Sequence, residues 1–93
     1  MQEKIKYTDE DIDRIFAERV AVSADAAALK AGVISEWSFT YPNGKVTADV
    51  ECAFCIDPAN ADYAVGCEVC NNKIKSKLWY ICGQYSLITG EKL

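Results

Sequence analysis

The feature that most restricts how this chain folds is a duplicated pair of cysteines. Cys52 and Cys55 are separated by two residues, as are Cys67 and Cys70, and eleven residues lie between the pairs. Zn²⁺ binds four thiolates in a tetrahedron, and a tight turn with two residues between its cysteines aims both sulfur atoms at one point. The sequence therefore predicts one structural zinc ion held by Cys52, Cys55, Cys67 and Cys70.

The spacing of residues 52–70 resembles that of zinc ribbons and treble-clef modules in general. The resemblance implies a closed shell of four sulfur ligands, which leaves no position for water and makes the metal structural instead of catalytic. Two other interpretations stay open: reversible dithiol chemistry in redox or metal sensing, and unligated thiols packed as small core residues. Cys82 lies apart from both pairs and is expected in the core.

The chain has 93 residues, which predicts a single domain over residues 1–93. The core of so small a domain is marginal, and a bound metal is one common supplement. The N-terminal residues show no apolar run typical of a secretory signal, and no stretch is apolar enough for a membrane helix. We therefore expect a cytoplasmic, reducing location without a membrane partner, where paired cysteines favour metal over disulfides.

The N-terminal third has helical signals and is predicted to be helical over residues 8–32. Thr8 suits an N-cap and is followed by acidic residues, which also explains the acid cluster of residues 9–13. An apolar face follows at helical spacing, formed by Ile12, Ile15, Phe16 and Val20. Ser23 offers a second cap before an alanine-rich stretch, so the segment is expected to be two helices or one bent helix.

The pattern then changes to period two and predicts a β-hairpin over residues 34–53. Two alternating runs flank the turn signal Pro42-Asn43-Gly44. Asp49 and Glu51 are expected on the solvated face of the second strand, with the apolar face formed by Val46, Ala48, Val50 and Cys52.

The rest of the chain is predicted to hold the cysteine region and further strands. Asp57 and Gly66 suit the start and end of a short helix between the cysteine pairs. Residues 73–89 are expected to form C-terminal strands turned at residues 83–84. The predicted class is therefore α+β, with an N-terminal helical segment packed on a small antiparallel sheet beside a zinc-knuckle-like site of four cysteines.

The charge and the absence of histidine restrict the function. The chain has a net charge of −4 and no histidine, which removes the commonest general base and argues against an enzyme and against a general nucleic-acid binder. A local exception is a basic run with an aromatic, which on one strand face would contact phosphates and a base. It consists of Lys73, Lys75, Lys77 and Trp79, and Trp37 is a further candidate contact residue.

These observations favour a small non-enzymatic binding module, an adaptor or inhibitor that a structural zinc stabilises and that acts through protein–protein contacts. Abundant large aromatics suit such a role, since Trp and Tyr are favoured at interfaces. Three alternatives stay open. They are an acidic virus- or mobile-element-type inhibitor of a nucleic-acid-binding defence enzyme, a zinc-ribbon-like nucleic-acid binder using residues 73–79, and a dithiol redox or metal sensor.

Overall fold

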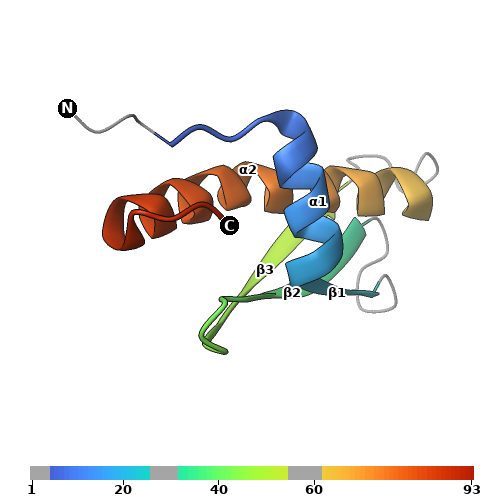
Figure 1. Cartoon of the computed structure of the whole chain (residues 1–93). Coiled ribbons are helices and arrows are strands. Elements are labelled where there is room, and N and C mark those ends of the chain that lie inside the picture. The colour runs from blue at the N-terminus through green and yellow to red at the C-terminus, as the bar shows by residue number, and fades with distance from the viewer. Residues whose placement is uncertain (1–4, 26–31, 55–61) are drawn as a thin grey trace.

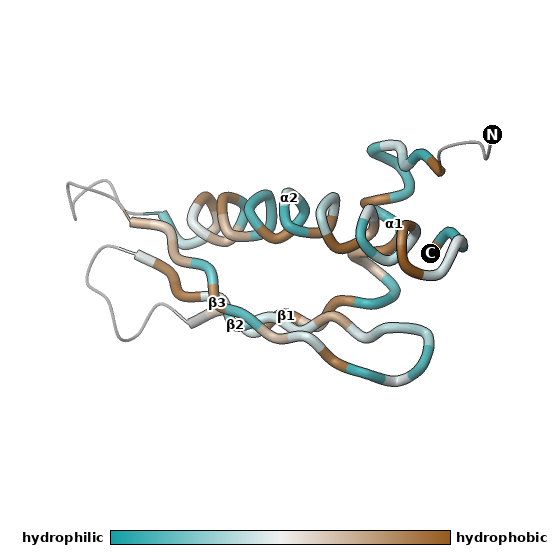
Figure 2. The backbone as a smooth tube through the Cα atoms, turned by 90° about the vertical axis from the view of Figure 1, so that its left-hand side faces the viewer, coloured by the Kyte–Doolittle hydropathy of each residue, from teal (hydrophilic) through white to brown (hydrophobic). Residues whose placement is uncertain are grey.

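The computed structural model describes residues 5–25, 32–54 and 62–93, which form a helix, a three-stranded meander and a second helix (Figure 1). The strands are antiparallel and lie in the order β1-β2-β3. Both helices lie on the same side of the sheet (Figure 2). The α+β class is therefore confirmed. The elements in chain order are α1 (Asp9–Arg19), β1 (Val20–Asp25), β2 (Gly32–Thr40), β3 (Val46–Phe54) and α2 (Tyr63–Thr89).

Helix α1 begins as the sequence predicts. The Thr8 hydroxyl accepts a hydrogen bond from the Asp11 amide at 3.1 Å, and the Asp11 carboxylate accepts one from the Thr8 amide at 2.9 Å. This capping box satisfies two amides that no helical carbonyl can reach. Ile12 and Ile15 are buried against the sheet and α2. The predicted helical face of the first segment is therefore confirmed.

The prediction of helix from residue 20 onward is wrong for the described part of that segment, because α1 ends at Arg19 and β1 begins at Val20. Val20 has extended backbone angles and leads directly into β1, which pairs with β2. Alternating Val20 and Val22 fit a pleated strand, and this pairing outweighs the helical preference of the neighbouring alanines. Residues 26–31 lie outside the described residues.

The predicted hairpin is confirmed and extends slightly further than expected, from Gly32 to Phe54. Its turn is closed by hydrogen bonds from the Gly44 amide to the Tyr41 carbonyl and from the Tyr41 amide to the Lys45 carbonyl. Gly44 has a φ of 88°, which a residue without a side chain adopts without strain. The Pro-Asn-Gly sequence thus sets the register of β2 and β3.

The expected C-terminal strands are wrong, because residues 63–89 form one helix of 27 residues. Asp62 caps its start by accepting hydrogen bonds from two amides, and Gly90 ends it in the left-handed conformation. Gly66 lies inside α2 and does not end a helix, while the expected cap at Asp57 lies outside the described residues. Buried side chains recur at every fourth position: Cys70, Ile74, Leu78, Cys82 and Ser86.

The core lies between the sheet and the two helices and has two parts. The larger cluster joins α1, β2 and α2 through Ile12, Ile15, Trp37, Phe39, Ile74, Leu78 and Cys82. The smaller one lies toward the start of α2 and consists of Val33, Ala53 and Cys70, with Cys67 packed against it. Both clusters use one face of the sheet.

The two faces of β3 are the reverse of the prediction. Glu51 and Ala53 are buried, so the odd-numbered side chains of β3 face the helices. The even-numbered residues face the other way; Cys52 is partly buried, and the others, including the valines at 46 and 50, are exposed. Alternation correctly identified the strand, but an apolar face does not by itself become the buried face.

Candidate functional site

The cysteines of the predicted zinc site lie on two elements. Cys67 and Cys70 are one helical turn apart on the side of α2 that faces the sheet. Cys70 is fully buried, and its thiol lies 3.9 Å from the Val33 carbonyl and 3.8 Å from the Glu51 carbonyl. Cys52 is partly buried on β3, and Cys55 lies outside the described residues. The helix thus replaces the second predicted knuckle turn.

The three described cysteines of this set do not fit a common tetrahedral site. Alternation along β3 places Cys52 on the face opposite to Ala53, and Ala53 packs with Cys70. The sheet therefore separates the Cys52 thiol from the pair on α2. Within the described ranges, no group of three or more Cys, Asp or Glu side chains is arranged to hold a metal ion.

Cys82 behaves as the sequence predicts and lies in the larger core cluster with no exposed surface. Burial raises the pKa of its thiol to about 11, since a thiolate loses its hydration there. Because the thiolate is the reactive form of cysteine, a fully buried thiol with a raised pKa is a poor nucleophile at neutral pH. It is a packing residue.

The lysines expected on one strand face instead follow the surface of α2 and point to different elements. The Lys73 ammonium donates to the Cys52 carbonyl at 2.6 Å, and Lys75 pairs with Asp13 at 3.0 Å and lies over the Phe16 ring. These contacts tie the helix to β3 on one flank and to α1 on the other. The prediction of a basic, period-two face is therefore wrong.

Lys77 makes the strongest of these connections. Its ammonium lies 2.8 Å from Asp49 and 2.5 Å from Glu51, and the Glu51 side chain is only 10% exposed. Hydrogen bonding to Lys77 lowers the pKa of Asp49, and the two carboxylates raise the pKa of Lys77. The half-exposed Asp49 and the buried Glu51 therefore anchor α2 to β3, and only Asp49 keeps the solvent contact that the sequence predicted for both.

The two tryptophans differ in what they offer a partner. Trp37 is 3% exposed and belongs to the core, so it is not the contact residue suggested by the sequence. Trp79 is 40% exposed, and the next residue, Tyr80, is 71% exposed, both on α2. Aromatic surface is thus available on the helix but not at Trp37.

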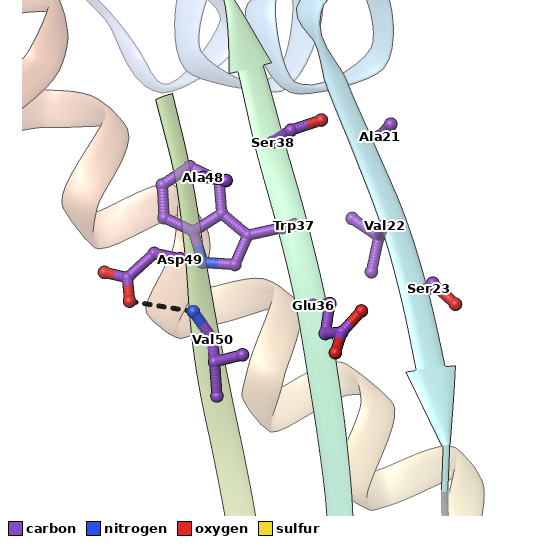
Figure 3. A pocket seen from close by; sticks show the side chains of 9 residues that line it. All are labelled: Ala21, Val22, Ser23, Glu36, Trp37, Ser38, Ala48, Asp49 and Val50. Carbon is purple, nitrogen blue, oxygen red and sulfur yellow. Dashed lines mark hydrogen bonds between the residues drawn. The ribbon is translucent and has the colours of Figure 1, made fainter. Parts of the chain in front are cut away.

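The described elements leave the outer face of the sheet uncovered. Both helices pack on the other side, so this face lies open (Figure 2). Val46, Val50 and Phe54 on β3 are 61%, 45% and 70% exposed. A shallow hollow crosses the three strands here, and its lining includes Ala21, Ser23, Glu36, Ser38, Ala48 and Val50 (Figure 3).

Register explains the shape of this hollow. Ser38 pairs with Ala21 on one side and with Ala48 on the other, so three small side chains lie level across the sheet. The next level carries Glu36 and Val50, which rise higher. This surface was not predicted from the sequence, although the apolar run of even-numbered β3 residues was a signal for it. The reason is that α2, which covers the opposite face of the sheet, was not predicted as a helix.

Comparisons with protein families, with curated proteins and with solved structures give no match for this chain. Neither described helix combines the length and the apolar character needed to cross a membrane. The function of this chain is therefore inferred from its surfaces.

Proposed function

We propose that the chain is a small protein-binding module whose docking surface is the outer face of the sheet. The observation that carries the proposal is the exposure of Val46, Val50 and Phe54 on a face that no described element covers. Contiguous exposed apolar surface on a soluble domain marks interaction sites, whereas scattered single residues do not. Adaptor and inhibitor roles both use such a surface.

The residues of this face predict which properties a partner surface should have. Small residues at Ala21, Ser38 and Ala48 form the floor of the hollow and suit an inserted apolar side chain. Glu36 is exposed at its margin and would pair with an Arg or Lys of the partner. The expected partner surface is therefore apolar, with one protruding side chain and one basic group nearby.

Structural zinc at the four cysteines is a separate prediction. Its remaining basis is the duplicated spacing, because Cys52 lies across the sheet from Cys67 and Cys70. Native mass spectrometry of the reduced protein, with and without a chelator, tests it directly. A stoichiometric metal that the chelator removes would support zinc, and a metal-free folded protein would contradict it.

The alternative roles gain less from the structure. Asp11, Asp13, Asp49 and Glu51 are all ion-paired within the chain, which weakens the case for an acidic surface that competes with nucleic acid. The three lysines at the centre of α2 contact β3 and α1, so a nucleic-acid contact through residues 73–79 also loses support. A buried thiol at Cys70 is a poor start for dithiol chemistry.

Site-specific photo-crosslinking tests the proposed docking face. A benzoylphenylalanine at Val50 is expected to form a covalent adduct with one discrete protein in producing cells, and Glu36→Lys should reduce that adduct at least about tenfold through charge repulsion. The same probe at Glu10, an exposed residue of α1, is the matched control and should not capture that protein. Equal capture from both positions, or none from Val50, would contradict the proposal.

A further inference from the structure

The free edge of β1 carries a row of backbone groups without a partner among the described residues. Residues along an antiparallel pair alternate between those that exchange hydrogen bonds with the partner strand and those whose amide and carbonyl point away from it. The hydrogen bond from the Tyr41 amide to the Lys45 carbonyl fixes this alternation for β2, so its odd-numbered residues bond to β3 and its even-numbered residues bond to β1. By the register of β1 on β2, Val20, Val22 and Ala24 therefore direct their amides and carbonyls to the outside of the sheet.

Two contacts at the ends of this row agree with the outward direction. The Val20 amide donates to the Phe16 carbonyl of α1, and the Ala24 carbonyl accepts a hydrogen bond from the Tyr63 hydroxyl at 3.5 Å. Between these contacts lie the Val20 carbonyl, both backbone groups of Val22 and the Ala24 amide. None of these groups has a hydrogen-bond partner in the described ranges, so they form a continuous row that an extended chain can pair with.

The opposite edge of the sheet, on β3, is interrupted at the centre of the strand. The Val50 amide points outward there and donates to the Asp49 carboxylate at 2.8 Å, and the Cys52 carbonyl accepts a hydrogen bond from the Lys73 ammonium at 2.6 Å. The uninterrupted open groups of β3 are thereby confined to residues 46–48, next to the hairpin turn. An added strand therefore pairs along the middle of β1, whereas on β3 it would meet groups that side chains already hold.

The side chains of β1 also suit the addition of a strand. The segment from Val20 to Ala24 contains no charged residue and no proline, which are the residues that commonly block a sheet edge. Val22 is 38% exposed at this edge, and a neighbouring strand would cover it with a cross-strand side chain. We infer that the partner of the proposed docking face contributes an extended segment that pairs with β1 as a further strand of the sheet, and this inference rests on the proposed function.

The outer face beside β1 determines the chemistry of that segment. Glu36 is exposed on β2 and lies level with Ser23 of β1 on one side and with Val50 of β3 on the other. Neighbouring strands lie about 4.8 Å apart, so the added strand is about 10 Å from β2, and an Arg or Lys level with Ser23 reaches the Glu36 carboxylate across the small serine. The segment should therefore carry a basic residue on its outer face and, next to it in sequence, an apolar residue beside Val22.

Extended peptides test the inference on the full chain without the natural partner. A phage-displayed library of random linear peptides, each about six to nine residues long, is enriched on the immobilised protein, and sequences that alternate apolar and basic residues are expected. The best peptide is then synthesised with N-methyl groups on alternate residues, in two series. Methylation of the peptide edge that faces β1 should weaken binding at least about tenfold, whereas methylation of the other edge should leave it unchanged. A library without binders, or a peptide that tolerates both series, overturns the inference.

Amide hydrogen exchange locates the bound peptide. Exchange at the amides of Val22 and Ala24 should slow when the peptide binds, while the Ala48 amide, which points outward on β3, is the matched control and should not change. Val22→Pro removes one outward amide and should weaken the peptide at least about tenfold, whereas Ala48→Pro should not; circular dichroism checks that both variants are folded. Protection of Ala48 in place of Val22 overturns the inference.

The proposed docking face and the strand addition fail separately. If a protein crosslinks to the probe at Val50 and Val22→Pro leaves that adduct unchanged, the docking face stands and strand addition is overturned. If the probe at Val50 captures no protein but a peptide protects Val22, strand addition at β1 is supported and the outer face loses its proposed role. A dimer of the unchanged chain in sedimentation equilibrium that Val22→Pro dissociates would assign this edge to a second copy and overturn the inference.

Discussion

Gly66 and Gly83 allow the contact between α2 and the sheet to be measured directly. Both glycines lie inside the same helix, where replacing glycine by alanine normally adds about 0.5–1 kcal/mol of stability. A Cβ at Gly66 would lie 2.6 Å from one methyl group of Val33, whereas a Cβ at Gly83 would contact nothing within 4 Å. Gly66 is therefore required by close packing, and Gly83 is not.

The magnitude follows from comparing the two variants. The gain in helix propensity is common to both, so it cancels in the difference. Val33 is 2% exposed and its branched side chain is stiff at χ1, so it cannot easily move away. Overpacking of this kind costs about 1–3 kcal/mol. We expect Gly66→Ala to be less stable than Gly83→Ala by that amount.

Urea unfolding of both variants under the same conditions gives the difference in the free energy of unfolding. A double-mutant cycle with Val33→Ala then isolates the clash, because Val33→Ala removes the methyl group while its own cavity cost appears in both arms. A coupling energy of about 1–3 kcal/mol is expected. If Gly66→Ala is as stable as Gly83→Ala, the close approach of α2 to β2 is refuted.

Three further predictions concern charge and thiol reactivity. Lys77→Met should lower the free energy of unfolding by about 1–3 kcal/mol, because the buried Glu51 loses its partner, and urea unfolding at pH 7 measures this. Thr8 and Lys92 lower the pKa of Asp11 from 3.8 to about 2. The ionised Asp11 therefore stabilises the folded state fully above pH 3.8, and this stabilisation is lost as the pH falls toward 2. The difference in free energy of unfolding between the unchanged protein and Asp11→Asn should disappear over that pH range in an acid titration. With iodoacetamide at pH 8, mass spectrometry should find Cys52 alkylated well before Cys82, because Cys82 is fully buried and its thiol has a raised pKa. Protection of Cys52 that a chelator removes would contradict this prediction and would support a bound metal.

The local signals of α1 and of the hairpin were sufficient to predict both elements. Thr8 and Asp11 complete a capping box within four residues, and the Pro-Asn-Gly turn fixes its own hydrogen bonds through Gly44. In each case the decisive interactions join residues close in sequence. Such elements can be predicted because no distant part of the chain needs to be placed first.

Helix α2 was missed because a spacing of four residues fits two structures. Ile74, Leu78 and Cys82 recur every fourth position, which keeps them on one face of a helix and equally on one face of a strand. Lys73, Lys75, Lys77 and Trp79 also recur at every second position, which is the period of a strand. The aromatic and β-branched residues of this stretch favour strands slightly, but burial against the sheet outweighs that preference.

The same ambiguity between helix and strand explains why the exposed face of β3 and the positions of the cysteines were predicted wrongly. Once residues 73–89 are taken as strands, the sheet seems to need its apolar β3 face for the core, and the two cysteine pairs seem to lie in loops. As a helix, this segment covers the face with Asp49 and Glu51, which it secures through Lys77. The valines at 46 and 50 are then left outside, and Cys67 and Cys70 turn toward the sheet. The packing of α2 on one face of the sheet thus decides which side of β3 is buried and which side is exposed.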